Sequence, residues 1–147
     1  MLVVFGDLNF RISYDNLKVR QACARGDVQW LRQRDELLLL KTHEPGSYQR
    51  QPTVKKPLTS ALIDSKLNAF FKFLDEGEIT FLPTYKYDVG TDRFDTSPKA
   101  RTPSFTDRVL FSAQQGLTLR KYGSIPCIKL SDHRPVCALF EFPVNLI

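Results

Sequence analysis

The alternation of apolar and polar positions predicts helices in the first half of the chain and strands in the second. An apolar run at 2–5 is followed by a glycine and an aspartate at 6–7, which is typical of a buried strand that stops at a turn. Apolar residues recur at helical spacing over 16–24 and again over 27–40, where Asp27 is a candidate N-cap. We therefore expect a strand followed by two helices in this part of the chain.

A polar stretch rich in proline separates these elements from the next one. Residues 41–57 contain three prolines, one glycine and many polar side chains, so we expect a surface loop there. Thr59 or Ser60 can cap a helix after this loop. The buried stripe of that helix is predicted from apolar residues at helical spacing, namely Leu62, Ile63, Leu67, Phe70, Phe71 and Leu74.

From residue 78 onward, short apolar segments alternate with turn residues. The polar stretch at 89–102 predicts a loop. Helices in the first half and strands in the second predict an α/β sandwich. The expected strands cover 79–82, 108–112, 117–119, 125–130 and 136–142.

Composition narrows the class of partner. The 147 residues are enough for one core, and 21 basic against 16 acidic residues give a net charge of +5. This excess favours nucleic acid, phosphorylated small molecules or an acidic membrane face, without choosing among them. The three cysteines form neither a CxxC pair nor a zinc spacing, and the first apolar run is too short for a signal peptide. We therefore expect an intracellular protein in a reducing compartment.

Three groups of acidic and polar residues lie at predicted strand ends, where open α/β sheets place their chemistry. The first group contains Asp7 and Asn9, which on an extended segment project from the same face. Such a pair can hold a metal-bound water and a phosphate oxygen. A turn in which Asp7 ends the strand is the structural alternative.

The other two groups contain the candidate acid–base residues. Asp107 precedes a predicted strand and can orient a histidine, with an ion pair to Arg108 as the structural alternative. Asp132 offers a hard oxygen ligand suited to magnesium. His133 can contact a phosphate or assist proton transfer, and its structural alternative is to close a turn. We expect no special role for the second histidine, His43.

Basic and aromatic residues on both sides of the polar loop form a candidate phosphate-binding group: Tyr85, Lys86, Lys99 and Arg101. Such side chains bind phosphate monoesters through charge-assisted hydrogen bonds, although a solvated basic face would have the same composition. Together with the acids, the asparagine and the histidine at strand ends, they favour metal-assisted attack of water on a phosphate ester.

Four short segments contain these candidate residues: FGDLNFRI at 5–12, PTYKYD at 83–88, RTPSFTDRVL at 101–110 and SDHRPV at 131–136. In this order they resemble the signatures of the inositol polyphosphate 5-phosphatases, and the run from 78 to 136 is most similar to those of type IV. The resemblance covers nearly the whole chain. Residues 41–60 lie outside it and are interpreted as an insertion.

The resemblance implies part of a four-layer α/β sandwich of the endonuclease/exonuclease/phosphatase type and magnesium-dependent removal of the 5-phosphate from inositol phosphates. Asp7 would orient or deprotonate the attacking water, and Asn9 would contact the scissile phosphate. Asp107 would hold His133 in its working tautomer, His133 would stabilise charge on that phosphate, and Asp132 would lie beside the metal. The 4-phosphate of a 4,5-bisphosphate or 3,4,5-trisphosphate headgroup would be bound by Tyr85, Lys86, Lys99 and Arg101.

The resemblance also implies that residues 1–147 are the C-terminal half of a catalytic domain. The other half of such a domain carries an asparagine, a histidine and the main metal-ligating glutamate. From this chain alone we therefore expect impaired activity, very weak magnesium binding and an uncovered inner sheet face. Arg11, although part of the first signature, is expected only to support the site.

Three hypotheses for function follow. The leading one is a phosphoinositide 5-phosphatase, and the second is a phosphoinositide-binding or interaction module without catalysis. The third, a magnesium-dependent nuclease, is disfavoured because a nuclease needs a groove that follows a nucleic-acid backbone. The expected partner is a phosphoinositide headgroup or an inositol polyphosphate, with a peripheral membrane surface and without nucleic acid, and the expected location is the cytoplasm.

Overall fold

The computed structural model describes residues 2–42, 65–112 and 116–143, and these form two antiparallel sheets with helices on one side. The first sheet has the strand order β1-β3-β2, from β1 (Val3–Asp7), β3 (Asp107–Phe111) and β2 (Asp75–Glu76). The second is a hairpin of β4 (Thr118–Ser124) and β5 (Val136–Glu141). The helices are α1 (Asn16–Arg25), α2 (Val28–Arg32), α3 (Glu36–Thr42) and α4 (Ser65–Phe73).

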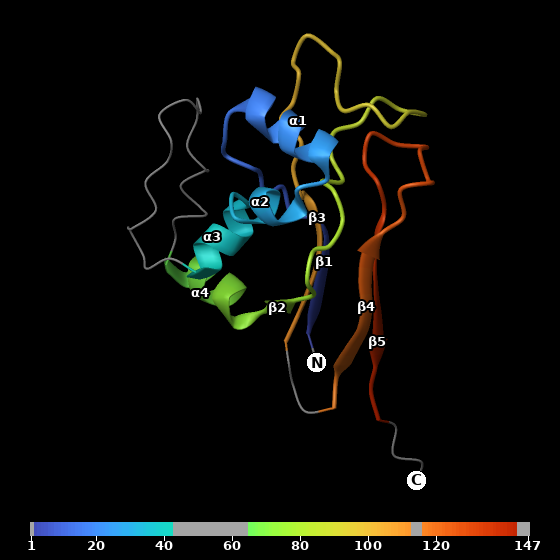
Figure 1. The fold of residues 1–147 in the computed structure, drawn as a ribbon. Helices are drawn as coiled ribbons and strands as arrows, with labels where there is room; N and C mark the ends of the chain where they lie inside the picture. Colours follow the sequence, from blue (N-terminus) through green and yellow to red (C-terminus); the bar gives the residue numbers. More distant parts are fainter. Residues whose placement is uncertain (1, 43–64, 113–115, 144–147) are drawn as a thin grey trace.

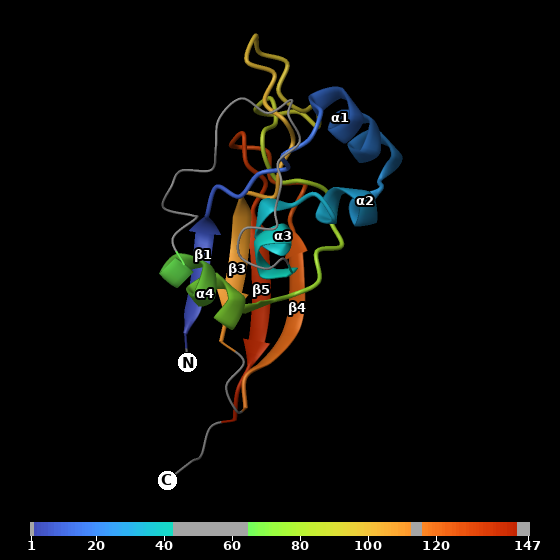
Figure 2. The same cartoon turned by 90° about the vertical axis from the view of Figure 1, so that its left-hand side faces the viewer.

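The elements stack in three layers. Figure 1 shows the helices on one side of the β1–β3 sheet and the β4–β5 hairpin on its other side, and Figure 2 shows the same stack from the helix side. The rings of Phe111 on β3 and Phe140 on β5 make an edge contact at 5.1 Å, which joins the two sheets. The predicted α/β sandwich is therefore confirmed.

The strand expected at 2–5 is present as β1 but continues to Asp7, so the predicted stop at Gly6 is wrong. The first predicted helix has nearly the expected bounds and clear local causes. The side chain of Asp15 accepts a hydrogen bond from the backbone N–H of Lys18 and caps α1, and Gly26 ends this helix at a φ of 68°. The buried side chains of α1 include Val19 and Ala22. These belong to a core cluster under the helices.

The single helix expected over 27–40 is wrong, because the segment forms two helices. Asp27 caps the first of them, α2, as predicted, by accepting from the N–H of Trp30. Asp35 then interrupts the helix, since its backbone pairs with Ile12 and its carboxylate accepts from the N–H of Leu38 at the start of α3. A tertiary contact therefore overrides the helical periodicity of the sequence.

In the second half, the strands expected over 108–112 and 136–142 are confirmed, and the one at 117–119 continues as β4 to Ser124. The strands expected over 79–82 and 125–130 are wrong. Ile79 is buried in the core without joining a ladder. The segment after β4 turns at Pro126, where the N–H of Ile128 bonds to the carbonyl of Ile125 at 3.2 Å.

The expected loop and helix around residue 60 can be compared only in part. Helix α4 is present and buries Phe71, and Leu74 behind it is also buried, whereas Phe70 and Phe73 are exposed. The first two residues of the loop expected at 41–57 belong to α3 instead. The remainder of that loop and several predicted residues lie outside the described residues, namely His43, Thr59, Ser60, Leu62 and Ile63.

Two apolar clusters form the core on the helix side of the first sheet. One surrounds Ile12 and Phe105, and the other contains Phe10, Leu37 and Leu110. Among the described helices, none has the length and apolarity that a bilayer span requires. The core therefore fixes β1 and β3 from the helix side and leaves their ends at one edge for the site.

Candidate functional site

The predicted acidic and histidine residues meet where β1 ends and β3 begins. Asp7 and Asp107 are ladder partners across these two strands. The loop before β5 brings His133 to the same edge, with its Nδ1 atom 3.0 Å from each carboxylate oxygen of Asp107. Segments 26 and 100 residues away from Asp107 thus converge at one end of the sandwich, among the loops at the top of Figure 1.

Further contacts fix the Asp107 carboxylate in place. The hydroxyls of Thr84 and Thr106 both donate to its Oδ2 atom, at 2.6 and 2.9 Å. The alternative of an ion pair between Asp107 and Arg108 is not what the structure shows, because Arg108 bonds to Asp35 instead. Asp107 is therefore oriented toward the histidine, as predicted, while its role in catalysis stays a prediction.

Tyr85 lies against the histidine and joins it to the first signature. The Tyr85 and His133 rings are 4.5 Å apart, and the guanidinium of Arg11 lies 4.6 Å from the centre of the Tyr85 ring. Backbone bonds to Ser104 hold Tyr85 beside the start of β3. Arg11, expected only to support the site, thus contacts two candidate residues, because its guanidinium also bonds to the side-chain oxygen of Asn9.

The expectation that Asp7 and Asn9 project from one extended face is wrong. Strand β1 ends at Asp7, and Asn9 adopts a φ of 60°, a left-handed conformation that asparagine tolerates. The backbone N–H of Asn9 donates to Oδ1 of Asp7 at 2.9 Å, so the structural alternative of a turn is present. Asp7 nevertheless pairs in the ladder with Asp107, and Asn9 contacts Arg11, whose guanidinium lies on the Tyr85 ring.

The basic residues divide into one that is paired and two that are exposed. Lys86 lies 3.7 Å from Oδ1 of the buried Asp95, whose carboxylate also accepts the backbone N–H groups of Ser97 and Arg101. Burial opposes ionisation of Asp95, but these hydrogen bonds and Lys86 outweigh it and lower the pKa of its carboxyl to about 2. Lys99 and Arg101 extend into solvent on the loop that Asp95 organises.

The loop that carries Lys99 and Arg101 is fastened to α1 by residues that the sequence analysis missed. The guanidinium of Arg20 donates to the backbone carbonyls of Phe94, Asp95 and Arg101 at 2.8–3.3 Å. Arg20 is itself oriented by Asn16 one turn earlier, at 2.7 Å. The spacing of four residues between the two was the only signal in the sequence.

The loop that carries His133 is held by its neighbours on both sides. The carbonyl of Asp132 accepts from the N–H of Tyr87 at 2.9 Å. Arg134 is buried, lies 3.9 Å from the centre of the Tyr87 ring and donates to the carbonyls of Thr91 and Ser131. Burial raises the pKa of Tyr87 to about 12, so this ring is a neutral platform.

A complete metal site is not formed by the residues that the structure describes. Within these ranges no group of three or more His, Cys, Asp or Glu side chains is arranged to hold an ion. Asp132 and Asp7 therefore supply at most a partial set of hard oxygen ligands.

The class of protein follows from the fold together with the residues at the edge of the sheets. Helices cover one face of a two-sheet sandwich, and an aspartate–histidine pair occupies the edge where strands end. This combination defines an α/β sandwich with a candidate site at one edge of its sheets.

Comparison with known proteins identifies the family. The model of the endonuclease/exonuclease/phosphatase family 2 matches residues 60–139, which is more than half of the chain, and the chain belongs to this family. The type IV phosphatidylinositol polyphosphate 5-phosphatase of Mus musculus is 37% identical over 143 residues, covering 96% of this chain and 19% of that protein. Inositol-1,4,5-trisphosphate 5-phosphatase 1 of Schizosaccharomyces pombe is 37% identical over 140 residues, covering 95% and 10%.

Solved structures agree with this assignment. The 5-phosphatase domain of a synaptojanin, in complex with inositol (1,4)-bisphosphate and calcium, matches with a TM-score of 0.64 and 32% identity, covering 95% of this chain and 35% of that one. A Cimex nitrophorin matches with a TM-score of 0.70 and 28% identity, covering 97% and 42%. The predicted family and fold are confirmed, and the chain spans well under half of each of these proteins.

Proposed function

We propose that the chain forms the aspartate–histidine part of a phosphoinositide 5-phosphatase site, which hydrolyses the 5-phosphate of 4,5-bisphosphate or 3,4,5-trisphosphate headgroups. The observation that carries this proposal is the 3.0 Å contact between Asp107 and Nδ1 of His133, with two threonine hydroxyls on the same carboxylate. The match to a nitrophorin shows that a similar fold occurs in a protein that is not named as a phosphatase. The proposal therefore depends on the site residues and not on the fold.

The geometry supports a division of roles. A carboxylate that accepts from Nδ1–H leaves Nε2 of His133 to face the ligand, where the imidazole stabilises charge on the scissile phosphate. Asp7, across the ladder, orients or deprotonates the attacking water. Asn9 contacts the same phosphate from the turn that follows β1. These roles are carried over from the family signatures.

For the headgroup, we propose that the 4-phosphate binds to the loop organised by Asp95. Arg101 and Lys99 are exposed and free to reach an anion, while Lys86 and Tyr85 line the approach to His133. Free inositol phosphates and the lipid headgroup share this chemistry. The location consistent with such a substrate is the cytoplasm, peripherally at membranes.

Mg²⁺ is the proposed cation of the complete enzyme, with Asp132 beside it. Because the described residues supply no group of three ligands, we expect weak Mg²⁺ binding and low turnover from the chain alone. The same observation favours a second candidate function, a fragment that binds phosphoinositides without hydrolysing them.

The two functions separate in one set of measurements on the full chain. Calorimetry with inositol 1,4-bisphosphate tests binding, and phosphate release from phosphatidylinositol 4,5-bisphosphate vesicles with Mg²⁺ tests turnover. We expect Arg101→Ala to weaken binding by roughly tenfold, since one charge-assisted contact is lost. Arg120→Ala is the matched control, because it removes the same charge from an exposed ion pair with Glu141 on the hairpin.

The outcomes assign the function. Binding with turnover that disappears in His133→Asn supports the phosphatase, and binding without turnover supports the non-catalytic fragment. Equal losses from Arg101→Ala and Arg120→Ala would show that only net charge attracts the ligand. Cleavage of duplex DNA in place of the vesicle lipid would support the nuclease and contradict both.

A further inference from the structure

We propose that Asp35 and Glu36, at the start of α3, are positioning residues that hold the two halves of the site in register. Glu36 holds the segment that follows Asn9, and Asp35 holds the arginine that follows Asp107. The contacts of these two acids are with residues behind the site and not with His133 or Asp107. The proposal rests on the proposed function, because it concerns the same site.

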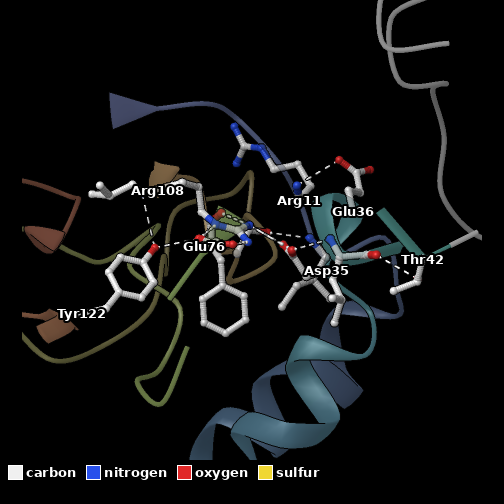
Figure 3. A network of polar contacts seen from close by, with 12 residues as sticks. Arg11, Asp35, Glu36, Thr42, Glu76, Arg108 and Tyr122 are labelled. Atoms are coloured by element: carbon white, nitrogen blue, oxygen red, sulfur yellow. Dashed lines mark hydrogen bonds and ion pairs between the residues drawn. The ribbon is translucent and has the colours of Figure 1, made fainter. Parts of the chain in front are cut away.

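Glu36 contacts the first signature and the serine that follows it. Its Oε2 atom accepts from the backbone N–H of Arg11 at 2.9 Å, and its Oε1 atom accepts from the hydroxyl of Ser13. In return, the backbone N–H of Glu36 donates to the carbonyl of Arg11 at 2.9 Å. Figure 3 shows this contact at the edge of the polar network. Arg11 is thus fixed at both its backbone polar groups.

Asp35 makes the equivalent contact with the second signature. Both of its oxygens accept from Nη1 of Arg108 at 2.9 Å, and the two side chains are 1% and 2% exposed. Arg108 completes its bonding with Glu76 at 2.6 and 2.7 Å, which in turn accepts from the hydroxyl of Tyr122 on β4 (Figure 3). Buried groups with this many partners have little freedom to move.

The consequence for the site follows from adjacency in the chain. Arg11 bonds to Asn9 and lies on the ring of Tyr85, which contacts His133. Loss of the Glu36 carboxylate therefore releases a segment that reaches the ligand edge through three successive contacts. A catalytic group displaced by a small distance loses much of its effect, so residues behind it control function without taking part in the reaction.

The test compares Glu36→Gln with Asp27→Asn in the full chain. Glu36→Gln keeps one acceptor oxygen and loses the charge. Asp27→Asn loses the same charge at the cap of α2, away from the site, and keeps an oxygen that can cap this helix. Ser13→Ala removes one partner of Glu36 without changing charge and serves if Glu36→Gln fails to fold. Three quantities are measured: unfolding in urea, affinity for inositol 1,4-bisphosphate, and the NMR signals of the Asn9 side-chain amide and the His133 ring.

We expect Glu36→Gln, or Ser13→Ala in its place, to shift the Asn9 and His133 signals and to weaken inositol bisphosphate binding roughly tenfold while the chain is folded. Asp27→Asn, which removes the same charge away from the site, should leave both unchanged. Unshifted signals in the Glu36 and Ser13 variants, or equal shifts in Asp27→Asn, would overturn the positioning role. If the wild-type chain binds no inositol bisphosphate, the proposed function is wrong. The NMR comparison then decides the positioning role by itself.

Discussion

The two faces of β3 differ in how completely they are covered. On the helix side, Arg108 and Leu110 are fully enclosed, the first by carboxylates and the second by the apolar cluster of Leu37 and Leu74. On the other side, the hairpin covers Phe111, but β1 beside it is open. Phe5, which pairs with Val109 and faces the same way, is 74% exposed.

The difference shows that the residues that stabilise the fold and the candidate site residues lie on different sides of the sheet. The helix-covered face contains the core and the ion network that fix the strands. The site residues lie at the strand ends on the less covered side. Open apolar surface on the inner face of a sandwich is typical of a site for further polypeptide.

The largest loss of stability is expected from Arg108→Met, on the covered face of β3. This change leaves Asp35 and Glu76 buried without their cation, and breaking a buried pair in this way costs about 3–5 kcal/mol. Chemical unfolding in urea measures the loss. A change below about 1 kcal/mol would show that water reaches the network and that the helix face is not closed.

A smaller loss of stability is expected from a substitution at Gly77, where the chain after β2 packs against the hairpin. A Cβ at Gly77 would lie 2.6 Å from the Cβ of Tyr122 and 2.7 Å from Cδ2 of Leu119, both on β4. Gly77→Ala therefore forces the hairpin away and should cost roughly 1–3 kcal/mol by urea unfolding. Gly123→Ala is the matched control, because a Cβ there meets no atom within 4 Å. Equal stability of the two variants would mean that the hairpin is not packed against β2.

The sequence predicted local elements and signature residues better than it predicted the contacts that join distant segments. Helix α1, β3 and β5 followed from periodicity, and the partners Asp107 and His133 from their signatures. The break in the helix at Asp35, by contrast, depends on Arg108, which is 73 residues away in the sequence. No local pattern contains such a contact, because propensity describes neighbours along the chain and not partners across it.

The same limit applied to the loop that presents the basic residues. Lys99 and Arg101 were found by charge and motif. Arg20, Asp95 and Arg134, which shape the loops around them, were missed because each acts on backbone carbonyls or N–H groups. A side chain that bonds to backbone has no complementary residue type in the sequence to reveal it.

Acid should weaken the hydrogen bonds that organise the loop around Asp95. The folded-state pKa of Asp95 is about 2, below the ordinary value of 3.8, so its contribution is present above pH 4 and is lost as pH falls toward 2. We expect the unfolding free energy of the wild-type chain to drop by about 1–2 kcal/mol more than that of Asp95→Asn between pH 5 and pH 2.5. Parallel pH curves for the two proteins would contradict the bonding described for Asp95.

The smallest effect is expected on the open face, at Phe5. Phe5→Thr keeps a residue suited to a strand and removes an apolar ring that is already 74% exposed, so the unfolding free energy should change by less than about 0.5 kcal/mol. Self-association measured by analytical ultracentrifugation should decrease, because the ring is part of the uncovered surface. Val4 points to the opposite, covered face of β1 and provides the matched variant, Val4→Thr, which places a hydroxyl against the core and should cost more stability without reducing association. A larger loss from Phe5→Thr than from Val4→Thr would reverse the assignment of the covered and open faces.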